Sequence, residues 1–346
     1  MISHSKPTIS EKDIAAVSEV LKSGKISQGE QIENFEKKLS LFVGHKEGVA
    51  VHSGTSALHL ALMALEISKG DEVALPSFVC SSPLHAVKYV DATPLFIDIN
   101  PETLNMDPED LKKKITQKTR AIILPHMFGL PADIDAIIKT GVPLIEDCAH
   151  SLGATYRDRP VGSYGLLSIY SFYATKMIAT GEGGMLSTDS KELLERARDL
   201  RDYDKKEDYT VRYNYKMSDM EAALGISQLS RLSEFIQKRK EIAMLYHQEL
   251  KNLPLEIPKE YDDRTHIYYR YIVKVTGDLL AFQERLAKEG VICERPVFKP
   301  LHRYFDLPPC LGAEKAWENS LSIPIYPSLT DGEIEKIIHT IKRVSQ

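Results

Sequence analysis

Residues Gly48–Leu65 read GVAVHSGTSALHLALMAL and contain the unit from which this fold is built. The apolar run Gly48–His52 favours a β-strand, and the small residues after it favour a tight turn. From Thr55 to Leu65, leucine and alanine recur at helical spacing. A strand that leads through a turn into an amphipathic helix is typical of sheets covered by helices.

The same alternation continues along the chain. Strand-like runs occur at Glu72–Leu75, Pro94–Ile99, Arg120–Pro125, Pro143–Asp147, Leu166–Phe172 and Gly184–Thr188. Helical patterns occur at Ser82–Tyr89, Pro108–Ile115 and Asp133–Lys139, with a charged helix from about Ser190. The repetition predicts an α/β fold with an open, mostly parallel sheet sandwiched by helices.

The C-terminal third has a different pattern. Residues Ser218–Leu250 indicate one long helix or two abutting ones that link to a second domain. A strand (Tyr268–Val275), a helix (Leu279–Gly290), a proline-rich loop (Pro296–Pro309) and a last helix (Asp331–Val344) follow. We therefore expect a large domain over 1–235 and a small C-terminal α+β domain over 236–346.

Composition excludes several classes of protein. The 346 residues carry a formal net charge of −5, with 43% hydrophobic and 27% charged residues, which are ordinary globular values. Nothing in this balance favours nucleic acid or membrane as a partner, and no apolar run approaches the roughly 20 residues that cross a bilayer. The four cysteines are widely spaced without a Cys-x-x-Cys pair. We expect reduced thiols, a cytoplasmic location and no metal site.

The first chemical motif is Ser53–Leu58, SGTSAL, at the strand-to-helix turn. Glycine permits a sharp turn, and the amides and hydroxyls of a helix N-terminus can bind a phosphate. The alternative is an ordinary serine cap after the turn. The motif is not a Walker A loop, and the chain contains no G-x-G-x-x-G sequence.

The second motif is Leu144–His150, LIEDCAH, in which an acid pair ends an apolar strand. Open α/β sheets bind ligands beyond the carboxyl ends of their strands. Asp147 is therefore placed to hold a positive charge on a bound ring, or else to cap the next helix.

The third motif is Ser171–Lys176, SFYATK, which is followed by the glycine-rich run TGEGG at 180–184. A sheltered lysine loses its charge readily, so its amine can become a nucleophile, although most single lysines lie at the surface. An anion cradle, a strand-end aspartate and a sheltered lysine together provide the three contacts that pyridoxal 5′-phosphate (PLP) requires.

Further strings match a known family in order and spacing. They are SKP at 5–7, LKSGKISQG at 21–29, SGTSAL at 53–58, EDCAHSLGA at 146–154, SFYATK at 171–176, GEGG at 181–184, YNYKMSD at 213–219 and SIPIYP at 322–327. With these strings the whole chain resembles the DegT-type PLP-dependent aminotransferases that act on nucleotide-linked keto sugars. The resemblance implies a seven-stranded PLP domain of the aspartate-aminotransferase type.

The resemblance also implies roles for individual residues. Lys176 would form the Schiff base with PLP, and Asp147 would pair with the ring nitrogen. Further cofactor contacts would be Gly54, Thr55, Ser56, Cys80, His150, Ser171 and Asn214, the last reaching the phosphate from the neighbouring subunit of a homodimer with shared active sites. Glu182 would shape the loop beside the cofactor. His302 and Tyr304 are candidates for sugar contacts, or for loop packing.

Two positions depart from the family pattern. Cys80 stands where an aromatic residue commonly stacks on the cofactor ring, so Cys80 or Phe78 would have to fill that place. Lys216 stands where arginine is usual, and a point charge does not reproduce the contacts of a planar guanidinium.

The implied reaction has two halves. An amino acid, by resemblance L-glutamate, would give its amine to the cofactor, and the resulting pyridoxamine phosphate would pass it to a keto sugar on a nucleoside diphosphate, in polysaccharide biosynthesis. The alternatives are a PLP-dependent sugar dehydratase of the same family, which has histidine in place of Lys176, and a non-catalytic PLP-binding regulator. We expect the loops 25–28, 156–160 and 296–304 to select the sugar.

Overall fold

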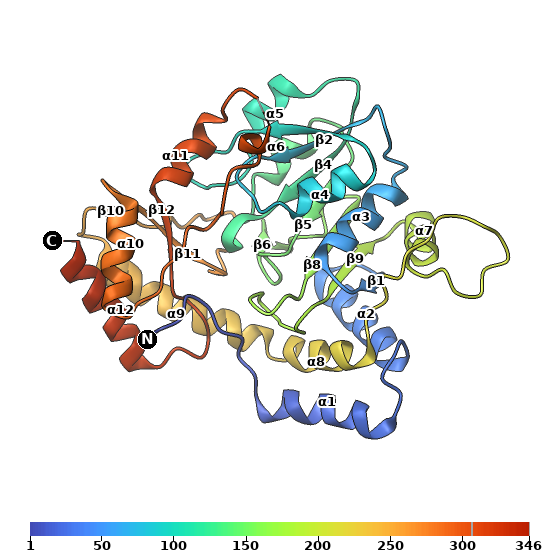
Figure 1. The fold of residues 1–346 in the computed structure, drawn as a ribbon, viewed down its shortest axis with the longest axis horizontal. Coiled ribbons are helices and arrows are strands. Elements are labelled where there is room, and N and C mark those ends of the chain that lie inside the picture. Colours follow the sequence, from blue (N-terminus) through green and yellow to red (C-terminus); the bar gives the residue numbers. More distant parts are fainter. Residues whose placement is uncertain (306, 346) are drawn as a thin grey trace.

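The computed structural model describes residues 1–305 and 307–345. Its centre is a seven-stranded sheet in the order β1-β9-β8-β5-β4-β2-β3 (Figure 1). The strands are β1 (Glu47–Val51), β2 (Glu72–Pro76), β3 (Thr93–Ile97), β4 (Thr119–Pro125), β5 (Leu144–Asp147), β8 (Leu167–Ser171) and β9 (Gly184–Thr188). The pairs β3/β2, β2/β4, β4/β5 and β5/β8 are parallel, whereas β9 is antiparallel to both β8 and β1. The expected mostly parallel α/β sheet is confirmed.

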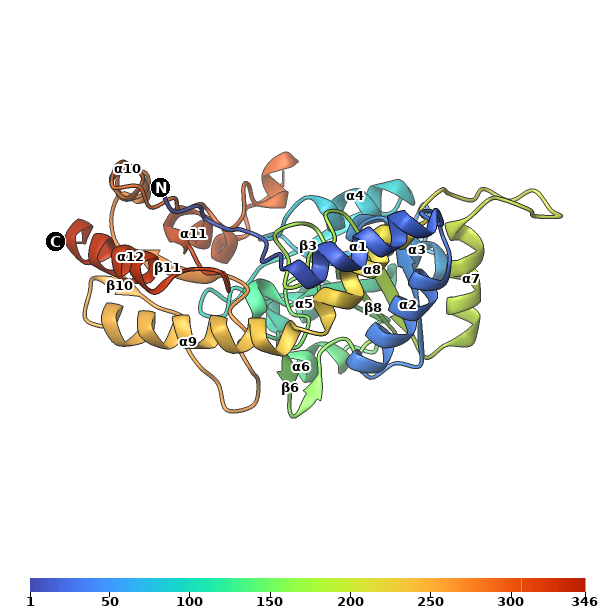
Figure 2. The ribbon, with the colours of Figure 1, turned by 90° about the horizontal axis from the view of Figure 1, so that it is seen from below.

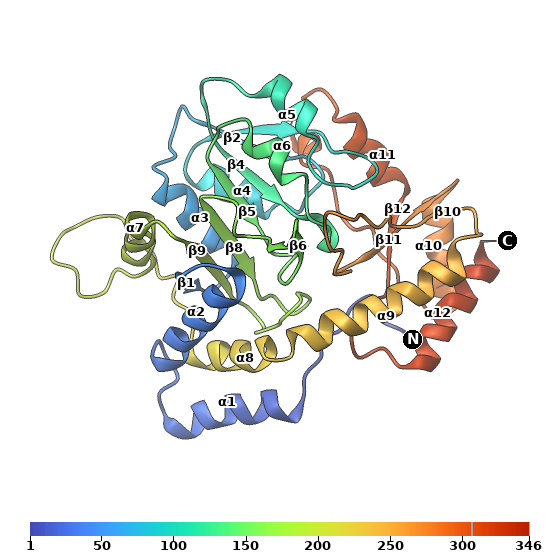
Figure 3. The same cartoon turned by 180° about the vertical axis from the view of Figure 1, so that it is seen from behind.

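Helices cover both faces of this sheet because its strands are apolar on both sides. Ile123 and Ile145 point into one core with α3 (Gly54–Ala64), α4 (Ser82–Tyr89) and α7 (Lys191–Arg201). Ile122 and Leu144 point into the other, which includes residues of α2, α5, α6 and α8. Those helices span Glu30–Val43, Pro108–Lys114, Ile134–Ile138 and Asp219–Leu229, and α1 (Glu11–Ser23) packs on α8 (Figure 3). Side chains that alternate between two covered faces give the continuous apolar runs seen in the sequence.

A second, smaller body lies at the C-terminal end (Figure 2). Its antiparallel sheet has the order β10-β11-β12, from β10 (Leu255–Glu256), β11 (Tyr271–Val275) and β12 (Ser320–Ile323). The accompanying helices are α9 (Leu232–Leu250), α10 (Leu279–Lys288) and α12 (Asp331–Val344), whereas α11 (Leu311–Asn319) buries Ala313 and Ala316 in the large-sheet core that contains Ile123. Shorter elements are β6 (Thr155–Tyr156), β7 (Arg159–Pro160), η1 (Met127–Gly129) and η2 (Leu301–Tyr304).

The link between the two bodies is α9, which starts against the large sheet and ends in the small body. Leu232 belongs to a core of the large sheet, whereas Ile242 belongs to the core of the small one. Ile2 also lies in the small core, since its amide bonds to the carbonyl of Gly290 at 2.7 Å. The boundary between residues 235 and 236 therefore falls inside a helix and stays a prediction. Within the described residues, no helix has both the length and the apolar character needed to cross a membrane.

One of the two alternatives expected over Ser218–Leu250 is confirmed, because the stretch forms two helices, α8 and α9. One expected element differs from the structure. The strand expected from Tyr268 begins only at Tyr271, because Tyr268 has φ 51° and the chain turns there. A positive φ is costly for a residue with a side chain, so tertiary contacts must hold this turn.

Candidate active site

A cavity of about 280 Å³ lies at the carboxyl ends of β5 and β8, beside the N-terminus of α3. Open α/β sheets bind their ligands at this edge. Eight residues that the sequence singled out line it together: Gly54, Thr55, Cys80, Asp147, His150, Ser171, Lys176 and Glu182. The other lining residues are Ser53, Leu58, Val79, Ser82, Pro125, Ala149, Ile169 and Tyr173.

The turn before α3 forms one wall of the cavity. Ser53 caps the helix, since its Oγ accepts from the Ser56 amide at 3.1 Å, so the capping interpretation is confirmed. Gly54 faces Ser171, and a Cβ on Gly54 would lie only 2.9 Å from the Ser171 Cβ. A side chain there would clash with Ser171, so glycine allows β8 and the helix to approach closely at this wall. The Thr55 Oγ1 lies 2.7 Å from the Ser82 Oγ, so hydroxyls from two helices meet at this wall.

Ser56 does not line the cavity with its neighbours. It is 5% exposed, and its hydroxyl lies 2.9 Å from the Nδ1 of His52 and 2.8 Å from the Ser53 Oγ. These bonds support the turn.

Asp147 presents its carboxylate to the cavity from the end of β5. The residue is 7% exposed, and its Oδ1 accepts from the Ala149 amide at 3.0 Å. Among the described residues, no basic side chain forms an ion pair with it. Burial raises the pKa of Asp147, although the charge of Lys176 acts in the opposite direction. A buried carboxylate of this kind is stabilised by a ligand that brings a cationic N–H.

Glu146 points to the opposite face of the sheet, because successive side chains of a strand alternate. It is fully buried and accepts the backbone amides of Gly162, Tyr164 and Gly165 at 2.8, 2.7 and 2.6 Å. Burial raises its pKa, but bonds from His126 and these amides outweigh burial, so the pKa is lowered. Glu146 therefore organises the loop between β7 and β8.

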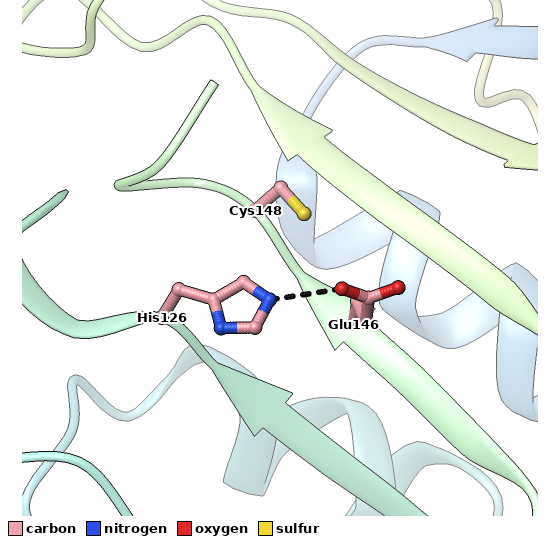
Figure 4. A group of neighbouring side chains, drawn as sticks. All are labelled: His126, Glu146 and Cys148. Carbon is pink, nitrogen blue, oxygen red and sulfur yellow. Dashed lines mark hydrogen bonds and ion pairs between the residues drawn. The ribbon is translucent and has the colours of Figure 1, made fainter. Parts of the chain in front are cut away.

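His126, Glu146 and Cys148 cluster closely enough to suggest a metal site (Figure 4). The His126 Nδ1 accepts from the Ala132 amide at 3.1 Å, which places the proton on Nε2, and Nε2 lies 3.0 Å from the Glu146 carboxylate. Both ring nitrogens are thus committed to protein partners. Burial raises the pKa of the Cys148 thiol well above its usual value, so it is a poor source of thiolate. The cluster is best explained as a structural network.

Lys176 lies on the segment between β8 and β9. This segment is fixed at its base, where the amides of Phe172 and Ala174 bond to the carbonyls of Gly183 and Gly181 at 2.9 and 3.1 Å. The Lys176 Nζ lies 5.3 Å from the ring centroid of Tyr269, a cation–π distance.

Tyr269 contacts two lining residues, His150 and Lys176, and the sequence patterns did not single it out. Its ring stacks on His150, with centroids 4.4 Å apart, and His150 also stacks on Phe128 at 5.9 Å. Burial, followed by the charge of Lys176, lowers the pKa of His150 well below its usual value, so its ring is neutral. Burial opposes ionisation of Tyr269, but Lys176 and Arg270 lower the pKa of its hydroxyl to about 8.

Gly129 permits the close approach of Tyr269. A Cβ on Gly129 would lie 2.8 Å from the Tyr269 backbone nitrogen, and Gly129 has φ 96°. Tyr269 lies more than a hundred positions after His150, so no local pattern could have brought the two together.

The remaining candidates lie outside the cavity. His302 is 3% exposed and bonds to Ser77 and Glu314, at 2.6 Å each, which favours a packing role. Tyr304 is half exposed, and the Lys299 ammonium lies 4.3 Å from its ring centroid. Asn214 is exposed and follows the long loop after α7 that projects from the body (Figure 2).

The structure also shows what surrounds Cys80 and Lys216, the two residues that depart from the family pattern. Phe78 is fully buried with its ring 6.4 Å from Phe128, outside the cavity, whereas Cys80 lines the cavity. Lys216 bonds to Asp202 at 2.7 Å, which raises its pKa, and so it holds the base of the projecting loop.

Comparisons with known proteins agree with this geometry. The profile of the DegT/DnrJ/EryC1/StrS aminotransferase family matches residues 7–342. The chain belongs to this family. The aminotransferase is 35% identical to the spore coat polysaccharide biosynthesis protein SpsC of Bacillus subtilis, over 99% of this chain and 96% of SpsC. It is 34% identical to GDP-perosamine synthase of Escherichia coli O157:H7, over 97% of this chain and 96% of that protein.

Solved structures share its architecture. The Streptococcus pneumoniae protein Spr1654 in its PLP form superposes with a TM-score of 0.94 at 28% identity, covering 99% of this chain and 98% of that one. Its pyridoxamine phosphate form gives a TM-score of 0.95 at 28% identity, covering 100% of this chain and 99% of that one. This aminotransferase is accordingly a PLP-dependent sugar aminotransferase.

The residues of the cavity fit PLP. The hydroxyls of Thr55 and Ser171 beside the N-terminus of α3 suit a phosphate, the Asp147 carboxylate suits a cationic ring nitrogen, and the Lys176 amine suits an aldehyde. The volume is near the lower end of the roughly 300–1,000 Å³ usual for ligand cavities, which matches a small cofactor.

Proposed function

We propose that this aminotransferase moves an amino group from L-glutamate to a keto sugar carried on a nucleoside diphosphate. The observation that carries the proposal is the meeting of Lys176 and Asp147 with the wall formed by Gly54, Thr55 and Ser171 in one cavity. The name of GDP-perosamine synthase, a relative at 34% identity, supports a nucleotide-linked sugar.

Each part of the cavity has a separate task in this proposal. Bound PLP supplies an aldehyde that combines with amines and a ring that withdraws electrons from the carbon bearing the amine. The hydroxyls of Thr55 and Ser171 and the amides at the start of α3 would hold its phosphate. Asp147 would keep a proton on the ring nitrogen, since its buried carboxylate favours a cationic partner.

In this proposal Lys176 transfers the proton of the donor's α-carbon. It is the only amine among the described residues that line the cavity, so its Nζ is the candidate for both covalent attachment and general base. With the cofactor and the donor bound, the free Nζ would remove the proton from the donor's α-carbon. The presence of lysine at this position argues against the dehydratase alternative.

Two further features belong to the proposal. Asn214 is exposed and lies outside the cavity of its own chain, which is compatible with a contribution to the neighbouring site of a homodimer. The name of SpsC supports a role in polysaccharide biosynthesis, and four free cysteines fit a reducing cytoplasm.

Spectroscopy and a substrate panel test the proposal. The purified protein with PLP should be yellow, and L-glutamate should bleach the visible band. Keto sugars linked to different nucleoside diphosphates should then restore the band, and the most effective one identifies the acceptor. A Lys176→Ala variant serves as the control without a band. A wild-type band that neither L-glutamate nor any sugar changes would favour the non-catalytic regulator.

A further inference from the structure

Arg270 is a half-buried arginine near the cavity, and it has no anionic partner among the residues that the structure describes. In the described parts of the chain, its guanidinium makes no ion pair and no hydrogen bond. By contrast, Arg264 on the same segment binds the Asp263 carboxylate through two nitrogens at 2.8 and 2.7 Å. Removing a guanidinium from water without a counter-charge is costly, so a ligand that brings an anion would stabilise Arg270.

Arg270 lies beside the proposed reacting groups. Its Cζ is 4.9 Å from the ring centroid of Tyr269, and the Lys176 Nζ is 5.3 Å from the same centroid. The Tyr269 ring also stacks on His150, which lines the cavity. The Tyr269 ring therefore contacts three groups: the Lys176 amine, the His150 ring and the Arg270 guanidinium.

Other basic groups lie close enough to Arg270 to feel its charge. Arg239, only 4% exposed, pairs with no carboxylate in the described part of the chain, and its Nη1 donates to the carbonyls of Tyr268, Tyr269 and Ile325 at 3.3, 3.2 and 2.6 Å. Burial and then the charge of Arg270 lower the pKa of Arg239 to about 9 and that of His4 to about 3. An anion would relieve this excess of positive charge.

The backbone holds Arg270 in place before any ligand arrives. Its amide bonds to the carbonyl of Phe128 at 3.2 Å, and Arg239 holds the two preceding carbonyls. Tyr268 is kept at φ 51°, a conformation that persists only where surrounding contacts enforce it. A fixed backbone reduces the entropy lost when the side chain orders around a ligand.

We propose that Arg270 binds the α-carboxylate of the amino donor. This inference rests on the proposed function, because it takes the donor to be an α-amino acid. The donor must bring its amine to the place of the Lys176 Nζ, and its carboxylate is attached to the carbon that bears this amine. A guanidinium at the same aromatic ring can then receive the two carboxylate oxygens through paired N–H groups.

The test compares Arg270→Met with the wild-type protein in the donor half of the reaction alone. L-glutamate and 4-aminobutyrate, which is the same molecule without the α-carboxylate, are titrated against the PLP-loaded protein while bleaching of the visible band is followed. We expect Arg270→Met to raise the L-glutamate concentration for half-maximal rate about 10- to 100-fold, the usual value of a hydrogen bond between charged groups. The response to 4-aminobutyrate should not change.

A binding measurement avoids catalysis altogether. Calorimetry with the cofactor-free protein should show the same loss of L-glutamate affinity in Arg270→Met. Arg270→Lys keeps the charge without the planar fork and should lose less than Arg270→Met. The matched control is Arg285→Met, because Arg285 is exposed and also lies over an aromatic ring, that of Phe282 at 5.9 Å. It should behave as wild type in both assays.

The possible results separate the two proposals. Equal responses of wild type and both Arg270 variants to L-glutamate would overturn the carboxylate assignment and leave the proposed function intact. If Arg270→Met weakened only the response to the nucleotide sugar and not the response to L-glutamate, the carboxylate assignment would be overturned in favour of a phosphate contact. A wild-type band that L-glutamate does not bleach would contradict the proposed donor, and this result does not depend on any variant.

Discussion

Glu146 and Asp147 are adjacent in β5 but face opposite sides of the sheet. We therefore expect Glu146→Gln to lower the stability of the fold and Asp147→Asn to lower the activity. Glu146 Oε1 accepts from the amides of Tyr164 and Gly165, and Oε2 accepts from Gly162 and faces the Nε2 of His126. In Glu146→Gln, the amide NH₂ must replace one of these oxygens. Two buried N–H groups that bonded to that oxygen then face the NH₂ group of the glutamine, which is also a donor.

The loss of stability follows from these contacts. A buried donor left without its acceptor costs about 1–3 kcal/mol, so two cost about 2–6 kcal/mol. His126 cannot compensate by moving its proton, because its Nδ1 already accepts from the Ala132 amide. The loss is a large part of the about 5–15 kcal/mol that holds a typical domain folded. Asp147→Asn removes a buried carboxylate whose pKa is raised, so we expect unchanged or slightly higher stability and a severe loss of transamination.

Urea unfolding of the cofactor-free proteins, followed by circular dichroism, measures both effects, and the bleaching assay measures activity. The pKa of Glu146 is lowered, so its contribution to stability is present above the unfolded pKa of about 4.3 and is lost as pH falls through the lower folded value. Glu146→Gln should therefore unfold at lower urea at pH 7 and differ less from wild type in acid. Equal unfolding midpoints for Glu146→Gln and wild type at pH 7, or full activity of Asp147→Asn, would refute this reasoning.

Three other predictions concern the site. Lys176→Ala should lose the visible band and all transamination while still binding PLP non-covalently, as equilibrium dialysis would show; a retained band would rule out Lys176 as the attachment point. If sites are shared between subunits, mixing Lys176→Ala with Asn214→Ala protein should give heterodimers with one intact site and measurable activity, whereas verified heterodimers without activity would exclude this arrangement. The lowered pKa of Tyr269 predicts that one tyrosine ionises near pH 8 and that Tyr269→Phe abolishes this ultraviolet absorbance change; identical titrations would contradict it.

Local patterns predicted the elements whose signals lie within a few residues. The helix expected at Ser82–Tyr89 matches α4 at both ends, and the strand expected at Gly184–Thr188 matches β9. Continuous apolar runs indicated strands buried on both faces, and the two cores confirm this. The capping box between Ser10 and Asp13 at the start of α1 was also present in the sequence and could have predicted that helix.

The sequence by itself determined the chemistry of the cavity, since the serine and glycine turn, the strand-end aspartate and the lysine each stand at the end of a recognisable element. Tertiary structure alone decided the surroundings of that chemistry: the stacking of Tyr269 on His150, the placement of Arg270 and the commitment of both His126 nitrogens. The physical reason is the distance along the chain over which each kind of interaction acts. Hydrophobic periodicity and capping act over one or two turns of chain, whereas these contacts join residues that only the packing of the second body and its connecting segment against the sheet brings together.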